Sequence, residues 1–222
     1  MTAPGPARPD PPAHPPAPAG SPGPAGSIAG AGSAAPAVPA GSRRAFDDGD
    51  LARRVAARVR DVPDFPLPGV LFKDLTPLLA DGPLFGEVAG AITDRHAGAG
   101  FDVVAGVEAR GFLVAAAVAV ASGVGVVPVR KAGKLPWRTV AASYQLEYGE
   151  ATVEVHADAF AEHRRVLLVD DVLATGGTLG AAADLVSRAG GELAGVSVVV
   201  ELTALGGRAR LGDLDVHAVL AA

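Results

Sequence analysis

The sequence predicts an α/β fold built on a mostly parallel, doubly wound sheet. Short apolar segments alternate along the chain with stretches of helical periodicity, which is the pattern of β-α-β units. In the clearest unit, the apolar run Val166–Val169 leads through a glycine-rich turn into a helical stretch that begins at Leu179. Such a run is typical of a strand buried on both faces, as parallel strands are. With 222 residues, 49% of them hydrophobic, the chain can bury one substantial core.

The first 45 residues differ from the rest in composition. They hold 12 of the 19 prolines and few large apolar side chains, so they cannot bury enough surface to offset the entropy cost of ordering. Prolines interrupt every apolar run, so we expect no secretion signal there. The sequence therefore predicts a disordered Pro/Ala/Gly-rich tail at 1–45 and one folded domain at 46–222.

Charge and residue usage exclude several classes of protein. Residues 46–222 contain 16 basic and 23 acidic side chains, an acidic balance that argues against nucleic-acid binding. The longest apolar run, Phe112–Ala121, is half the length of a membrane span. Because there is no cysteine, disulfides and thiolate metal sites are excluded. We expect a cytoplasmic enzyme without a nucleic-acid or membrane partner.

Apolar periodicity places the remaining elements in order. An amphipathic helix is predicted at Asp50–Arg60, with its four arginines on a solvated face, and a second at Leu84–His96, with His96 as a surface cap. An apolar helix follows Gly111, and a last short helix is predicted at Arg208–Leu211. The predicted strands are Phe101–Val107, Val124–Val129, Thr152–His156, Arg165–Asp170, Ala194–Glu201 and Val216–Leu220.

The carboxyl end of the strand Arg165–Asp170 carries the strongest chemical signal. Asp170 and Asp171 are followed by the small, glycine-rich segment Ala174–Thr178 and then by a helix, so backbone N–H groups and a helix N-terminus converge on one spot. That arrangement suits a phosphate monoester. Carboxylates repel phosphate, so the acid pair suits the vicinal hydroxyls of a ribose. The implied ligand is a ribose 5-phosphate, while P-loop and dinucleotide-binding motifs are absent.

Three segments together resemble the adenine phosphoribosyltransferases. Val166–Thr178 resembles the phosphoribosyl diphosphate (PRPP) motif of type I phosphoribosyltransferases. Phe65–Asp74 resembles the F-P-x-P-G-[IV]-x-F-[KR]-D segment of the adenine enzymes, and Ser143–Gly149 resembles their S-Y-x-L-E-Y-G segment. The similarity extends from about residue 62 to 210. It implies a type I phosphoribosyltransferase fold with a small hood over the base and a mobile lid loop at Arg130–Gly149.

The resemblance also implies roles for individual residues. The catalytic candidates are Arg110, Glu147, Asp170 and Asp171. Glu147 is the candidate for handling the proton on the purine because it is the only acid in the predicted lid before Gly149. The 5-phosphate would bind to the loop residues Ala174, Thr175, Gly176, Gly177 and Thr178. Pyrophosphate would bind to Glu108, Ala109, Arg110, Lys131 and Lys134, and adenine to Leu71, Phe72, Lys73 and Val172. Mg²⁺ would enter with PRPP, without a direct protein ligand.

The implied reaction is purine salvage: adenine and PRPP give AMP and pyrophosphate, catalysed by a homodimer. Two alternatives stay open, namely another purine phosphoribosyltransferase, such as a xanthine or hypoxanthine-guanine type, and a non-catalytic sensor of PRPP or purine on the same fold. Enzymes for 6-oxopurines typically place a lysine after the next strand. Here that strand ends in Val200–Thr203, which contains no lysine, so adenine is favoured.

Overall fold

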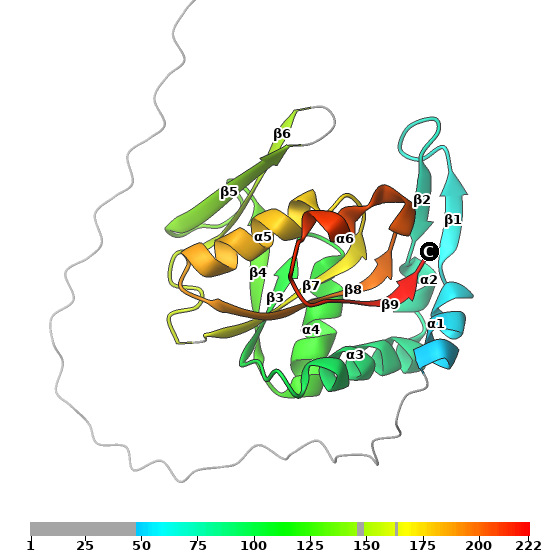
Figure 1. Ribbon diagram of the computed structural model, residues 1–222, viewed down its shortest axis with the longest axis horizontal. Helices are drawn as coiled ribbons and strands as arrows, with labels where there is room; N and C mark the ends of the chain where they lie inside the picture. The colour runs from blue at the N-terminus through cyan, green and yellow to red at the C-terminus, as the bar shows by residue number, and fades with distance from the viewer. Residues whose placement is uncertain (1–47, 146–148, 163) are drawn as a thin grey trace, which may run out of the picture. The chain divides into compact units, whose positions relative to one another are not determined.

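A seven-stranded sheet forms the centre of the computed structural model, which describes residues 48–145, 149–162 and 164–222 (Figure 1). Its strand order is β5-β6-β4-β3-β7-β8-β9, and all neighbours from β4 to β9 pair in parallel. The parallel strands are β3 (Val103–Val107), β4 (Gly125–Lys131), β7 (Arg165–Leu173), β8 (Glu192–Glu201) and β9 (Val216–Ala221). The predicted mostly parallel α/β sheet is confirmed.

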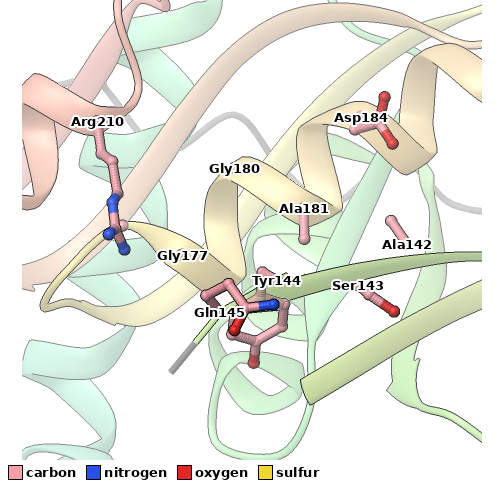
Figure 2. Close-up of a pocket in the computed structure, with 10 residues that line it drawn as sticks. Ala142, Ser143, Tyr144, Gln145, Gly177, Gly180, Ala181, Asp184 and Arg210 are labelled. Atoms are coloured by element: carbon pink, nitrogen blue, oxygen red, sulfur yellow. The ribbon is translucent and has the colours of Figure 1, made fainter. Parts of the chain in front are cut away.

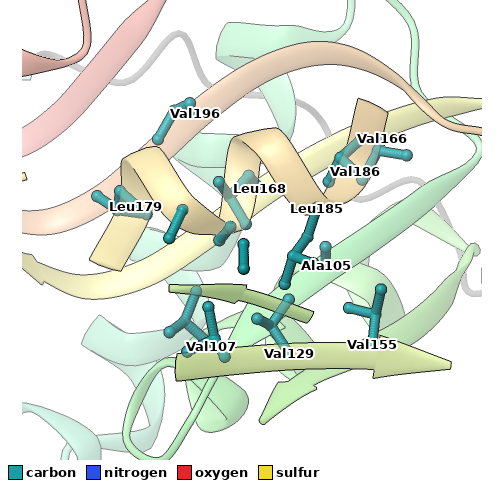
Figure 3. Packing of buried hydrophobic residues seen from close by; sticks show 14 of the residues in the cluster. Ala105, Val107, Val129, Val155, Val166, Leu168, Leu179, Leu185, Val186 and Val196 are labelled. Atoms are coloured by element: carbon teal, nitrogen blue, oxygen red, sulfur yellow. The ribbon is translucent and has the colours of Figure 1, made fainter. Parts of the chain in front are cut away.

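Helices cover both faces of this sheet. The strand residues Val104, Leu167 and Val169 pack against one group of helices, whereas Leu168 and Ala105 pack with α5 (Gly177–Arg188) on the other face. This alternation follows from the twofold side-chain repeat of a strand. Figure 3 shows the α5 side of the core. The helices of the first group are α1 (Asp48–Ala56), α2 (Thr76–Leu79), α3 (Gly82–His96) and α4 (Gly111–Ser122).

The chain reverses its direction of strand addition between β3 and β7. From β3 it passes through α4 to β4 on one side, and from β7 it passes through α5 to β8 and then β9 on the other. In open α/β sheets, the carboxyl ends of the strands at such a switch point frame the ligand crevice. The segments that begin at Glu108 and Asp170 leave these two strand ends, so the fold brings them together.

The region predicted as a mobile lid is partly a β-hairpin. β5 (Thr139–Gln145) pairs antiparallel with β6 (Glu150–His156), and β6 pairs antiparallel with the end of β4. Within the predicted lid loop, Arg130 and Lys131 belong to β4 and Thr139–Gln145 form β5, so these residues lie in strands and not in a loop. The strand predicted at Thr152–His156 exists, but as an antiparallel extension of the sheet. Glu147 lies outside the described residues.

A smaller antiparallel pair supplies the predicted hood. β1 (Arg60–Pro63) pairs with β2 (Leu71–Asp74), with Val62 opposite Phe72. The first predicted helix therefore ends earlier than expected, at Ala56. Its arginines are exposed, as expected, but they also form ion pairs, such as those of Arg54 with Asp50 and Glu87.

The C-terminal elements agree with the prediction, whereas His96 does not. A 3₁₀ turn at Thr203–Leu205 and the helix α6 (Gly207–Arg210) precede β9. His96 is fully buried, and its Nε2 lies 2.8 Å from Oγ of Ser197 on β8, so its assignment as a surface cap is wrong. Within the described part of the chain, we find no helix long and apolar enough to cross a membrane.

Candidate active site

The loop Ala174–Thr178 forms a cradle at the start of α5. It lines a cavity of about 70 Å³ together with Asp170 and Val172 at the end of β7. Because α5 begins at Gly177, the N–H groups of its first turn have no partner within the helix. A small cavity next to free N–H groups and the hydroxyls of Thr175 and Thr178 is suited to phosphate, as the sequence predicts.

The cradle requires glycine because α6 packs closely behind it. Gly176 has φ of +80°, and a Cβ there would lie 2.5 Å from the carbonyl oxygen of Gly207. A Cβ at Gly207 would in turn clash with the carbonyl oxygen of Ala174. The loop and α6 therefore contact each other backbone to backbone, which fixes the shape of the loop.

The two aspartates lie close to one another in a buried setting. Asp170 Oδ1 accepts a hydrogen bond of 2.8 Å from the backbone N–H of Asp171. A Cβ at Gly111, where α4 begins, would lie 2.5 Å from the same oxygen, so glycine lets this helix approach the carboxylate. Burial, and next the negative charge of Asp171, raise the pKa of Asp170 well above its usual value.

Arg110 joins the acid pair to the hood. Its Nε forms an ion pair with Asp171 Oδ2 at 2.6 Å, and that oxygen accepts no hydrogen bond from the described residues. Its Nη1 donates to the backbone carbonyl of Lys73 at 3.2 Å. Its guanidinium also lies over the ring of Phe72, 4.8 Å from the centroid. The structure thus brings together four residues that the sequence assigned to three different ligands.

Glu108 lies close to Arg110 in the sequence, but its carboxylate accepts hydrogen bonds from other residues of the protein. Its Oε2 accepts hydrogen bonds from the backbone N–H of Lys131 at 2.9 Å and from Nε of Arg130 at 3.3 Å. The Lys131 hydrogen bond is the main reason that the pKa of Glu108 is lowered. Ala109, the next residue, is exposed. The carboxylate therefore holds the end of β4 in place. The sequence had assigned Glu108 to pyrophosphate binding and gave no sign of this structural contact.

The lysines assigned to pyrophosphate are tethered through their backbones. The side chains of Lys131 and Lys134 are exposed, but the N–H of Lys134 donates to Glu154 Oε1 at 3.0 Å, as does that of Leu135 at 3.1 Å. Glu154 is 6% exposed. Sequence reasoning missed it, although an acid within an alternating apolar strand was an available signal.

The hood presents an aromatic face to the site. The rings of Phe65 and Phe72 meet edge to face with 5.1 Å between centroids. Nζ of Lys73 lies 2.7 Å from Asp61 Oδ1, so this side chain pairs within the hood, while the backbone carbonyl of Lys73 accepts from Arg110. Leu71 is exposed, and Val172 is half-buried on β7, next to the cradle.

A second cavity, of about 360 Å³, lies between β5 and the start of α5 (Figure 2). Tyr144 and Arg210 line it, and neither was assigned from the sequence. The hydroxyl of Thr178 donates to the phenol oxygen of Tyr144 at 3.0 Å, and the tyrosine ring would contact any Cβ at Gly177. The hairpin is thereby joined to the cradle.

Comparison with known proteins agrees with this geometry. The family described as phosphoribosyl transferase domain matches residues 78–217. The adenine phosphoribosyltransferase of Salinispora arenicola is 64% identical over 170 residues, which cover 77% of this chain and 90% of that protein.

Solved structures agree as well. The adenine phosphoribosyltransferase of Rhodothermus marinus is 45% identical with a TM-score of 0.75, covering 78% of this chain and 99% of that one. The Saccharomyces cerevisiae enzyme, complexed with D-2,5-dideoxy-2,5-imino-altritol 1,6-bisphosphate and adenine, is 36% identical with a TM-score of 0.73 and the same coverage. The chain belongs to the phosphoribosyltransferase family and, within it, to the adenine phosphoribosyltransferases.

Proposed function

We propose that this protein transfers the 5-phosphoribosyl group of PRPP to adenine and releases AMP and pyrophosphate, a reaction of purine salvage. One observation carries the proposal: Arg110 contacts Asp171 beside the phosphate cradle and also contacts Phe72 and Lys73 of the hood. A sugar phosphate and a flat base can therefore bind on either side of one guanidinium. Family membership supports the same reaction.

The cradle and the acid pair would hold the phosphoribosyl group. Backbone N–H groups of Ala174–Thr178 bind the 5-phosphate, and Asp170 and Asp171 accept hydrogen bonds from the ribose hydroxyls. Asp171 Oδ2 is suited to this role because it is buried, is positioned by its ion pair with Arg110 and accepts no hydrogen bond within the described part of the chain. Fixing the sugar in this way supplies proximity and orientation, the main source of rate in such a displacement.

The departing pyrophosphate would meet Arg110, the backbone at Glu108 and Ala109, and the side chains of Lys131 and Lys134. Arginine offers a planar fork for phosphate oxygens, and the exposed lysines add positive charge to an acidic protein. As pyrophosphate leaves, the bond from C1 of the ribose to oxygen breaks and the bond to N9 of the purine forms. Glu147 is our candidate for accepting the proton that N9 loses.

The residues present fit Mg²⁺ that enters with PRPP. Among the described residues, no cluster of three or more histidines or acids could hold a metal ion by itself. Mg²⁺ commonly binds through substrate phosphates with at most one or two carboxylates, and Asp170 and Asp171 lie beside the ribose position. When bound, the ion neutralises charge on pyrophosphate.

Adenine would stack on Phe72 and bind the backbone of Lys73. A carbonyl oxygen and an N–H match the 6-amino group and N1 of adenine. In a 6-oxopurine, O6 would face the carbonyl oxygen and the N1–H would face the N–H, so neither hydrogen bond could form. At the position where enzymes for 6-oxopurines typically have a lysine, Glu201 instead forms an ion pair with Arg208. Val172 and Leu71 would complete the apolar contacts to the base.

Steady-state kinetics with three bases test the proposal. We expect kcat/KM for adenine to exceed that for hypoxanthine and guanine by about 10⁴-fold, because unpaired polar groups in a closed site discriminate strongly. A hypoxanthine or guanine value within tenfold of adenine would favour a different purine specificity. Binding of PRPP without turnover of any base would favour the sensor.

We further propose that the protein acts as a cytoplasmic homodimer whose tail, residues 1–45, lies outside the folded domain. Leu113 and Val120 on α4 are 53% and 77% exposed, and Val126 on the neighbouring β4 is 47% exposed. These side chains form an apolar face suited to a second copy of the chain. The absence of cysteine is compatible with the cytoplasm.

A further inference from the structure

The phosphate cradle is backed by a short helix that is itself firmly held. Arg208 on α6 forms an ion pair with Glu201 at the end of β8, and its Nη1 donates to the carbonyl of Val216 at 2.6 Å. The side chain of Glu201 is 8% exposed and that of Arg208 48% exposed, so the buried glutamate anchors the arginine at the end of β8. The residues of α6 therefore have fixed positions relative to the loop that they support.

Arg210 extends from this helix to the cradle. Its Cβ would lie 3.2 Å from a Cβ at Gly176, and its Nη1 would lie 3.6 Å from a Cβ at Gly177. Figure 2 shows the side chain reaching from its helix toward the turn at Gly177. The guanidinium thus lies next to Gly177, the first residue of α5. Arg210 lines the second cavity and not the small one, but Gly176 and Gly177 line both, so only these two glycines separate the guanidinium from the cradle.

Arg210 is exposed, and its charge has no partner among the described residues. It has neither an ion pair nor a hydrogen bond with any other residue in the described ranges, in contrast to Arg208. Among the described residues that line the two cavities bordering the loop, it is also the only cation. A phosphate dianion beside Asp170 and Asp171 needs positive charge, and arginine pairs well with phosphate oxygens.

We propose that Arg210 is a 5-phosphate-binding residue for PRPP and AMP. The inference rests on the proposed function and adds a side-chain cation to a cradle that otherwise consists of backbone N–H groups and hydroxyls. A purely structural role would leave the guanidinium as a support for the turn at Gly177. The two roles can be distinguished. If Arg210 binds the phosphate, its substitution weakens only ligands that carry a phosphate, whereas loss of structural support weakens ligands with and without one.

The test compares AMP with adenosine, which differ only in the 5-phosphate. Calorimetry should show that Arg210→Gln weakens AMP binding ~10- to 100-fold, as expected for the loss of a charge-assisted hydrogen bond, and leaves adenosine binding unchanged. KM for PRPP should rise by a similar factor, while kcat stays within about threefold. Arg210→Lys should restore most of the affinity for AMP.

Arg188→Gln is the matched control. It removes the same charge from the other end of α5, about 16 Å away at 1.5 Å per residue, and should leave both ligands unaffected. Circular dichroism checks folding of each variant, and Arg210→Met replaces the glutamine variant if that one does not fold.

Equal weakening of AMP and adenosine would overturn the proposal in favour of structural support, and unchanged AMP binding would overturn it outright. Failure of the proposed function would appear separately, as a wild-type protein that forms no AMP from adenine and PRPP. The AMP-to-adenosine ratio would still report on Arg210 in that case.

Discussion

At the scale of single residues, Asp170 shows a conflict between stability and ligand binding. Its carboxylate is buried beside a second one, and its raised pKa means that the folded protein disfavours the ionised form. Unfolding exposes the group to water, where it ionises at its ordinary value. Above the folded pKa, the charge therefore lowers the free energy of unfolding. Ribose hydroxyls would compensate this cost once PRPP is bound.

Asp170→Asn should separate the two effects. Asparagine keeps the shape and can still accept from the N–H of Asp171, but it carries no charge. At pH 8 we expect a melting temperature equal to or above that of the wild type. We expect kcat/KM for PRPP to fall roughly 5- to 150-fold, which corresponds to a loss of ~1–3 kcal/mol of transition-state stabilisation. The difference in melting temperature should shrink as pH falls, because wild-type Asp170 then becomes neutral. A variant that melts well below wild type at pH 8 would contradict this account.

At the scale of secondary-structure elements, Glu154 of β6 holds the connection between β4 and β5. Glu154→Ala removes the acceptor for the N–H groups of Lys134 and Leu135, and so should free that connection. We expect trypsin to cleave after Lys134 about tenfold faster than in wild type, since proteolysis follows local opening. Glu154→Gln, which keeps an acceptor oxygen, should change the rate little. Equal rates in all three proteins would show that the buried carboxylate does not hold the segment.

The contact between α3 and β8 should make the fold sensitive to acid. Burial is the main cause that lowers the pKa of His96 to about 4, and the neighbouring charge of Arg95 adds to it. His217, whose pKa is also lowered, and Asp215 lie in the same cluster. Above pH 6.5 His96 is neutral in both the folded and the unfolded state, so the full contribution of the buried, neutral histidine to the free energy of unfolding is present. Below that, the unfolded chain binds a proton that the folded chain does not, so stability falls between pH 6.5 and about 4.

Urea unfolding of wild type and His96→Gln measures that effect. The free energy of unfolding of the wild type should drop by roughly 2–3 kcal/mol more than that of the variant between pH 7 and pH 4, at about 1.36 kcal/mol per unit of pKa shift. His217→Gln separates the share of the second histidine. Parallel pH profiles for wild type and His96→Gln would remove His96 as the acid-sensitive group.

The elements that sequence reasoning missed depend on distant partners. His96 lies on an amphipathic helix, and its partner Ser197 is 101 residues away, so no local pattern marks it as buried. The apolar run in Thr139–Gln145 is only Val140–Ala142, too short to mark a strand, and the segment becomes one because β6 supplies its hydrogen bonds. By contrast, the unit from β7 through the cradle to α5 was predictable because strand, loop and helix are contiguous and each has its own local signal.

At the scale of the whole molecule, the sheet topology assembles the candidate site. Glu108 and Arg110 follow β3, while the acid pair and the cradle follow β7, and the change in direction of strand addition makes these strands neighbours. That meeting could be anticipated from the α/β pattern. The contact of Arg110 with the Lys73 carbonyl could not, because the hood is a separate two-stranded sheet whose placement no periodicity specifies.

The composition of α4 bears on the proposed homodimer. This helix contains no charged residue, and a helix that is apolar on all sides is normally covered on all sides. One side packs into the core through Val114 and Val118, whereas Leu113 and Val120 are exposed. A twofold axis beside α4 would bury the same face of both copies, as symmetric dimers require.

Val120→Glu tests that interface. Light scattering after gel filtration should give the wild type about twice the 22.0 kDa mass of one chain, and the variant a mass close to a single chain, because burying an unpaired carboxylate in an apolar contact is strongly unfavourable. Leu205→Glu makes the same kind of change at a residue that is 52% exposed on the 3₁₀ turn and should remain dimeric. A dimer that survives Val120→Glu would place the interface elsewhere, and a wild type with the mass of one chain would remove the homodimer.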